Sequence, residues 1–159
     1  MILDGVSLFS EADRADFLAN YAPVVPITDY GSHLLWVWHF ARDRFLFKRY
    51  FRKTRETRRD VEFPSAEELH DITVEILKGI RTYHHAYLAS FNYRKEGRLP
   101  LIPVPTLVTA AGADPLYGYV ERVAALVPGS VKAPNAASAT PAAAAETAAL
   151  FASYLDGNP

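Results

Sequence analysis

The sequence predicts an α/β fold in which about three parallel strands carry a large helical insertion. Apolar segments with strand composition occur at residues 2–9, 106–110 and 130–133, and helical patterns separate them. Strands that alternate with helices favour a parallel sheet with helices on its faces. The long interval between the first and second strands is rich in helical patterns, so we expect the insertion there.

The first strand, residues 2–9, leads directly into a helix. Ser10 carries a side-chain oxygen that can cap a helix, and Glu11 and Asp13 place negative charge in the first turn. Phe17 lies on the apolar side of the same segment. We therefore expect a helix to begin directly after Ser10.

Three further helices are expected within the insertion. The segment 32–50 is rich in large apolar residues, and its length favours a helix over a strand. Ser65 and Glu68 form a capping box, and apolar residues follow it at helical spacing (Leu69, Ile72, Ile76 and Ile80). Gly79 is expected to end or loosen that helix before another at 82–93.

The last third of the chain returns to alternating strands and helices. Pro100, Pro103 and Pro105 make an extended segment that cannot be helical, and a short buried strand is expected at 106–110. A helix at 116–126, a short strand at 130–133 and a final helix from Thr140-Pro141 to Gly157 follow.

Composition excludes several classes of function. The 159 residues contain no cysteine, which excludes disulfides, thiolate zinc sites and cysteine nucleophiles and fits the cytoplasm. A formal net charge of −1 argues against attraction of the whole surface to nucleic acid or anionic membrane. No segment approaches the roughly 18 apolar residues of a membrane span. We expect a cytoplasmic protein with no membrane partner, no cofactor and no metal.

The stretch TLVTAAGADPLYGYVERVAALVPG at residues 106–129 is a strand, a turn with an aspartate, and a helix. Together with MILDGVSLF at the start and TPAAAAETAALFASYLDG at the end, it resembles the C-terminal half of the α/β-hydrolase superfamily. The resemblance implies that residues 1–9 are the first strand of a partial hydrolase core. It implies a helical lid at 10–99, and a strand-helix-strand-helix end of the core at 100–159.

By this resemblance, Asp114 is the acid of a Ser-acid-His triad. Its role would be to orient a catalytic histidine and to stabilise the charged form of that histidine. Ala111 stands where the family commonly has glycine. Some family members carry the acid at the end of the first strand, where this chain has Asp4, although Asp4-Gly5 favours a turn.

The partners that Asp114 would need do not occur in the sequence. Ser32 and Ser130 each follow a glycine, but neither completes the Gly-x-Ser-x-Gly nucleophile elbow. The family's histidine would fall within 132–138, yet no histidine follows His85. The leading hypothesis is therefore a C-terminal fragment, truncated or split, of a protein that hydrolyses ester-type or related small apolar substrates. We expect the chain alone to be inactive.

Two other classes of function remain open. The first is a non-catalytic binding or scaffold module derived from the same fold. The second is a helical regulator that binds nucleic acid through a basic cluster at residues 48–59. Nucleic acid is not favoured as a partner, because Glu56, Asp60 and Glu62 dilute the positive charge.

Two binding surfaces are predicted. An apolar pocket for a small apolar substrate could be lined by aromatic residues of the insertion, although such a stripe is more often core (Trp36, Trp38, Phe40 and Phe45). The first strand would present an unpaired edge, which favours a homo-oligomer or a complementary chain along that strand.

Overall fold

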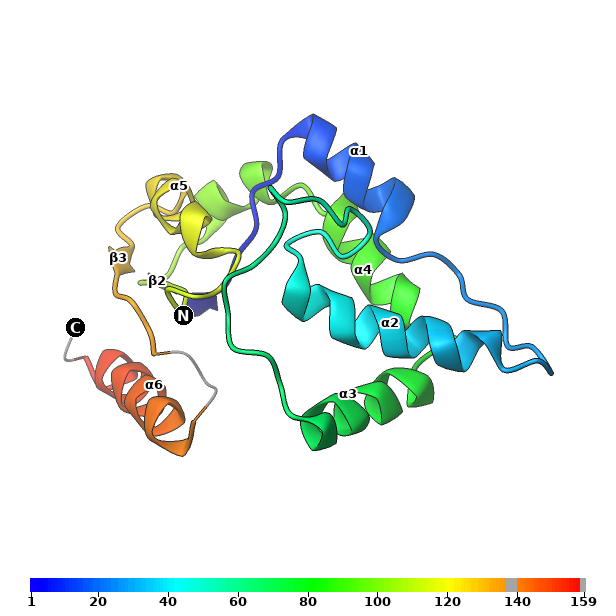
Figure 1. The fold of residues 1–159 in the computed structure, drawn as a ribbon. Coiled ribbons are helices and arrows are strands. Elements are labelled where there is room, and N and C mark those ends of the chain that lie inside the picture. The colour runs from blue at the N-terminus through cyan, green and yellow to red at the C-terminus, as the bar shows by residue number, and fades with distance from the viewer. Residues whose placement is uncertain (137–139, 158–159) are drawn as a thin grey trace. The chain divides into compact units, whose positions relative to one another are not determined.

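The chain forms two compact units in a computed structural model that describes residues 1–136 and 140–157 (Figure 1). The first unit combines Met1–Phe9 with the chain from Arg94 onward, and the second is Ser10–Tyr93. The helices and strands, in chain order, are β1 (Ile2–Asp4), α1 (Glu11–Asn20), α2 (Ser32–Leu46), α3 (Ala66–Lys78), α4 (Tyr83–Asn92), β2 (Leu107–Thr109), α5 (Val120–Leu126), β3 (Val131–Lys132) and α6 (Pro141–Leu155). Short 3-10 helices lie at Lys95–Gly97, Leu99–Leu101 and Tyr117–Tyr119.

The three strands form one parallel sheet in the order β1-β2-β3, as the sequence predicts. The middle strand is set by Val108, which pairs with Leu3 on one side and Lys132 on the other. All three residues of β2 are buried, as expected of a central parallel strand. The first strand ends at Asp4 rather than at residue 9, because Gly5 turns the chain with a φ of 63°.

Helices cover both faces of this sheet (Figure 1). On one face, Val108 packs against Val123 of α5 in a core that includes Leu8 and Leu99. Leu107 points to the other face, where α6 lies. Since Leu99 belongs to this core, the helical insertion ends at residue 93 and not at residue 99.

The second unit is helical, with α1 packed on α4 and α2 packed on α3. Its core is a cluster of aromatic rings, whose neighbouring ring centroids lie 4.8–6.2 Å apart (Phe17, Tyr21, Trp36, Phe40, Tyr50, Phe51, Tyr83, Tyr87 and Phe91). We call this set the aromatic cluster. Aromatic pairs at these separations stabilise a core beyond the area that they bury.

The predicted helix starts are confirmed at three positions. Ser10 accepts a hydrogen bond from the backbone of Asp13, and Thr140 caps α6 in the same way. Ser65 makes both bonds of a capping box. The long helix α2 ends at Leu46, and the polar segment after it is not helical.

Within the described part of the chain, no helix has the length and apolar character needed to cross a membrane.

Candidate functional site

Four polar side chains gather where the three parallel strands end, and we call them the polar edge (Asp4, Thr109, Asp114 and Asn135). Parallel strands all end on the same side of a sheet, so residues that follow different strands meet there. In open α/β sheets, ligands bind outside these carboxyl ends. The polar edge is therefore where a site is expected from topology alone.

Asp114 lies in the turn after β2, where the sequence predicts the acid. Its backbone N–H donates to the carbonyl oxygen of Ala111 at 2.9 Å, which closes the turn. Its Oδ1 accepts a hydrogen bond from the backbone N–H of Leu116 at 2.6 Å. One carboxylate oxygen is thus used to start the following helical segment, and Oδ2 is left to face the end of β1.

Gly5 brings that second oxygen close to β1. A Cβ atom at Gly5 would lie 3.6 Å from Oδ2 of Asp114, so the end of β1 lies beside the Asp114 carboxylate. The turn at Asp114 itself needs no glycine, because Ala111 has a negative φ. The substitution of alanine for the expected glycine therefore leaves the turn geometry intact.

Asp4 and Asn135 join the two outer strands across the end of β2. Asn135 Nδ2 donates a hydrogen bond to Asp4 Oδ1 at 2.9 Å, and Asn135 also bridges to Ala111. Only the amide nitrogen can donate, so the carboxylate fixes which way the amide points. Asp4 therefore contributes to the polar edge as well as to the turn at Gly5.

Two buried oxygens at the polar edge have no hydrogen-bond partner among the described residues. They are Thr109 Oγ1 and Asn135 Oδ1. Thr109 is 1% exposed and pairs with Asp4 in the sheet, so the two side chains share one face. Buried polar atoms without partners are uncommon and often mark functional sites.

The polar edge contains neither the histidine nor the serine of a Ser-acid-His triad. All five histidines lie between residues 33 and 85, outside the unit that contains Asp114. Asn135 falls within the segment where a histidine would be expected; residues 137–138 of that segment lie outside the described residues. An amide does not take up a proton near neutral pH, so Asn135 cannot act as a general base. In the parts of the chain that the structure describes, no group of three His, Cys, Asp or Glu residues could hold a metal ion.

The four aromatic residues predicted to line a pocket lie on two faces of α2. Trp36 stacks on Phe40 at 5.2 Å, and Phe40 is 2% exposed within the aromatic cluster. Trp38 and Phe45 are seven residues apart, so they share a different face of the helix, and Arg44 lies over the ring of Phe45. The four side chains therefore do not form one wall.

The tyrosines beside Phe40 confirm the core character of this region. Burial raises the pKa of Tyr21 to about 12 and that of Tyr83 to about 12. Burial also raises the pKa of Tyr50, whose hydroxyl donates to the backbone oxygen of Tyr21 at 2.6 Å. These hydroxyls stay neutral at physiological pH and act in packing rather than in proton transfer.

Asn135 is the residue that sequence reasoning missed. It carries no motif, and the signal that could have found it is positional, because it follows the third strand where a base is expected. No protein-family model matches the chain, and neither a curated protein nor a solved structure matches it. Function must therefore be argued from the geometry of the polar edge and of the helical unit.

Proposed function

We propose that this chain is the acid-bearing and lid-bearing part of an α/β-hydrolase-like protein and has no acyl-transfer activity of its own. The observation that carries the proposal is the hydrogen bond from Asn135 to Asp4. An acid stands at the carboxyl edge of a parallel sheet, and it binds the residue that occupies the place of a base. The helical unit is inserted in the chain between β1 and β2, at the point of the sequence where the family has its lid.

The two carboxylates present can orient a histidine base, but the polar edge holds no histidine and no serine nucleophile. Acyl transfer needs a nucleophile, a base within hydrogen-bond reach of it and donors for the oxyanion. The polar edge supplies carboxylates at Asp4 and Asp114 only. Hydrolysis of an ester-type or related apolar substrate therefore requires a complementary chain that brings the missing groups.

The edge of β1 is the place where such a chain would add. In the described sheet, β1 pairs with β2 on one side, and nothing pairs with its other side. An unpaired strand edge is a template for another strand. We expect an oligomer or a complex in size-exclusion chromatography with light scattering, and a stable, cooperatively unfolding monomer would contradict this assembly.

A restored base tests the proposal directly. In the Asn135→His variant, nearby carboxylates should raise the pKa of the introduced imidazole by about one unit. The pKa is measured by NMR titration in that variant and after adding Asp4→Asn or Asp114→Asn. The carboxylate that orients a base is the one whose removal lowers the pKa again. If neither removal changes it, the polar edge is not an acid-base arrangement.

The activity of the chain alone gives the second test. With p-nitrophenyl butyrate as substrate, we expect the unchanged chain to hydrolyse no faster than the Asp114→Asn variant. Hydrolysis that depends on Asp114 in the isolated chain would contradict the proposal, because a nucleophile and a base would then have to be present within it.

A non-catalytic binding module is the second candidate, and a cavity beside α6 favours it. The cavity has a volume of about 250 Å³ and lies away from the turn at Asp114, between strand residues (Leu107, Val131, Lys132 and Ala133) and helix residues (Leu150, Ser153 and Tyr154). Its mostly apolar lining suits a small apolar molecule. Binding of such molecules, measured by thermal shift and lost in Leu150→Trp, would support this function.

A further inference from the structure

A basic loop at residues 47–59 follows α2 and is held in one shape. Phe47 and Arg58 form an antiparallel bridge, and Lys48 N–H donates to the carbonyl oxygen of Thr57 at 2.7 Å. The Thr57 hydroxyl donates to the backbone oxygen of Arg52. The loop is therefore closed at its base and tied across its interior.

Two aromatic residues anchor the basic loop to the helical unit. Tyr50 packs against Phe40 with ring centroids 4.8 Å apart, and Phe51 packs against Phe17 at 5.9 Å. Both belong to the aromatic cluster, so the loop cannot swing freely. Its charged side chains consequently occupy defined positions on the surface of this unit.

Three of the loop's seven cations are neutralised by acids within the molecule. Arg49 pairs with Asp13 and, at 2.6 Å, with Asp16. Arg52 pairs with Asp16 at 2.5 Å. These two arginines hold the loop against α1, and their charge is not available to a partner.

Lys53 is used in the same way. It lies 2.5 Å from Asp43, which is 1% exposed and also binds Arg42 at 2.7 Å. Two cations therefore share one buried carboxylate. A buried charge needs such partners, so this arrangement serves the stability of the loop.

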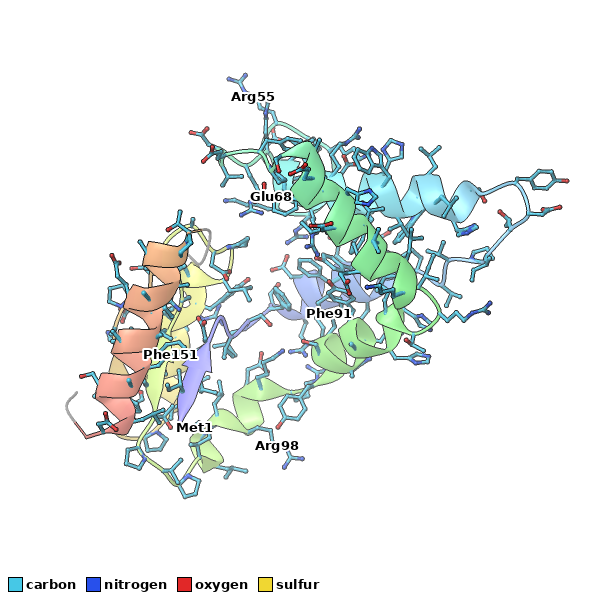
Figure 2. All side chains as sticks on the ribbon, turned by 90° about the horizontal axis from the view of Figure 1, so that it is seen from below. Met1, Arg55, Glu68, Phe91, Arg98 and Phe151 are labelled. Carbon is cyan, nitrogen blue, oxygen red and sulfur yellow. The ribbon has the colours of Figure 1, made fainter. Side chains whose placement is uncertain are left out.

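Arg59 donates from Nη1 to the backbone oxygen of Arg44 at 3.1 Å, which leaves three of the seven cations. Lys48, Arg55 and Arg58 are exposed, and their side chains make no ion pair with any described residue. Figure 2 shows Arg55 pointing away from the ribbon.

Glu56 stays ionised, because a hydrogen bond from Thr54 lowers its pKa, and it adds one negative charge to the loop. No ion pair joins the acids Glu56, Asp60 and Glu62 to these three cations in the described residues.

We propose that Lys48, Arg55 and Arg58 bind the phosphate backbone of a nucleic acid. Guanidinium groups match phosphate oxygens with paired hydrogen bonds. No large hydrophobic side chain of the loop itself is exposed, although Val61 and Phe63, which follow it, are 38% and 45% exposed. A surface that inserts into a membrane would need apolar side chains among the cations. The loop itself has no exposed ring for base stacking, so its cations contact phosphate and binding is independent of sequence.

The number of cations sets the expected salt dependence. For a single strand, log Kd rises with log salt concentration with a slope of about 0.7 per phosphate, or about 2 for three phosphates. Raising the salt from 50 to 200 mM should therefore weaken binding about 16-fold. A loop that lost all three cations should lose this slope.

The test uses fluorescence anisotropy with a labelled 20-nucleotide oligothymidylate and the full chain. The triple variant Lys48→Ala, Arg55→Ala, Arg58→Ala should weaken binding at 50 mM salt at least tenfold. A control variant with the same change in charge, Lys78→Ala, Arg81→Ala, Arg98→Ala, should stay within twofold of the unchanged chain. Circular dichroism confirms that both variants fold.

Several outcomes would overturn the proposal. Equal losses in both triple variants would show a response to net charge alone. Binding to vesicles with 30% phosphatidylserine but not to the oligonucleotide would assign the loop to membranes, and no binding at 50 mM salt would remove the surface altogether. Asp114→Asn should leave oligonucleotide binding unchanged, so this test and those of the polar edge fail independently.

Discussion

Asn135 is the polar-edge residue that follows the third strand and bridges to Ala111. Its amide bonds Asp4 across the end of β2 at 2.9 Å, so two outer strands are joined by side chains at this point. A hydrogen bond to a carboxylate near the surface contributes about 1 kcal/mol.

A double-mutant cycle measures this bond. Asp4→Ala and Asn135→Ala should each destabilise the chain, and the double variant should lose less than the sum of the two, with a coupling of about 1 kcal/mol. Urea unfolding followed by circular dichroism gives the free energies. Additive losses would mean that the bond contributes nothing in solution.

Gly5 allows a second residue-scale prediction. Its φ of 63° is strained for a residue with a Cβ atom, although a methyl group there would meet Asp114 Oδ2 at an ordinary 3.6 Å. Gly5→Ala should therefore lower the free energy of unfolding by about 1–2 kcal/mol. Gly118→Ala is the matched control, since its φ is not in the strained range and nothing lies within 4 Å. Equal effects would show that backbone conformation is not the cause.

At the scale of elements, the ion pairs between α1 and the basic loop make stability depend on pH. A hydrogen bond from Arg49 lowers the pKa of Asp13 below its ordinary 3.8, and one from Arg52 lowers that of Asp16. Because the folded pKa values lie below the unfolded ones, the pairs stabilise the fold above pH 4. This stabilisation is lost as the pH falls below 3.8.

Thermal unfolding between pH 5 and pH 2.5 tests this dependence. The melting temperature should fall across this range, and Asp13→Asn with Asp16→Asn should flatten the fall. Asp71→Asn serves as the control, because Asp71 makes no ion pair among the described residues. An unchanged profile in the double variant would show that these pairs do not stabilise the folded chain.

The elements that the sequence predicts best are those with local signals. Ser65 and Glu68 predict the start of their helix, because both bonds of the capping box are made within one turn. Prolines precede the buried strand at 106–110 and separate it from the helical segment before it. The length of the first strand was overestimated, although the turn at Gly5, whose φ is 63°, has a local signal in the pair Asp4-Gly5.

The residues of the candidate site also differ in whether local sequence predicts their positions. Asp114 could be placed from its turn, because strand, turn and helix are adjacent in sequence. Asn135 and Asp4 could not be paired, since their bond joins strands separated by the whole helical unit. The ion pairs of the basic loop with Asp13 and Asp16 are likewise tertiary contacts. The sequence shows that acidic and basic residues are present, but not which of them pair.

At the scale of the whole molecule, the helical unit has the features of an independently folding domain. Arg14, near the start of α1, donates to the backbone oxygen of Phe91, near the end of α4, at 2.8 Å. The two ends of the unit therefore lie side by side, and its aromatic cluster is contained within residues 10–93.

Residues 10–93 expressed alone should be helical and unfold cooperatively. Circular dichroism with heating measures this, and Phe40→Ala, which removes a ring that is 2% exposed, should lower the stability by about 3–5 kcal/mol. A noncooperative transition in the isolated unit would mean that it depends on the sheet.

Because Arg14 and Phe91 hold the two ends of the helical unit together, another inserted domain with adjacent ends could replace this unit. The sheet requires only that the chain leaves after Phe9 and returns at Arg94. Doubling the length of a loop costs only about 0.6 kcal/mol, so insertions of different size fit between the same two strands. The surface residues of the helical unit can therefore change in evolution while the register of β1 on β2 is kept.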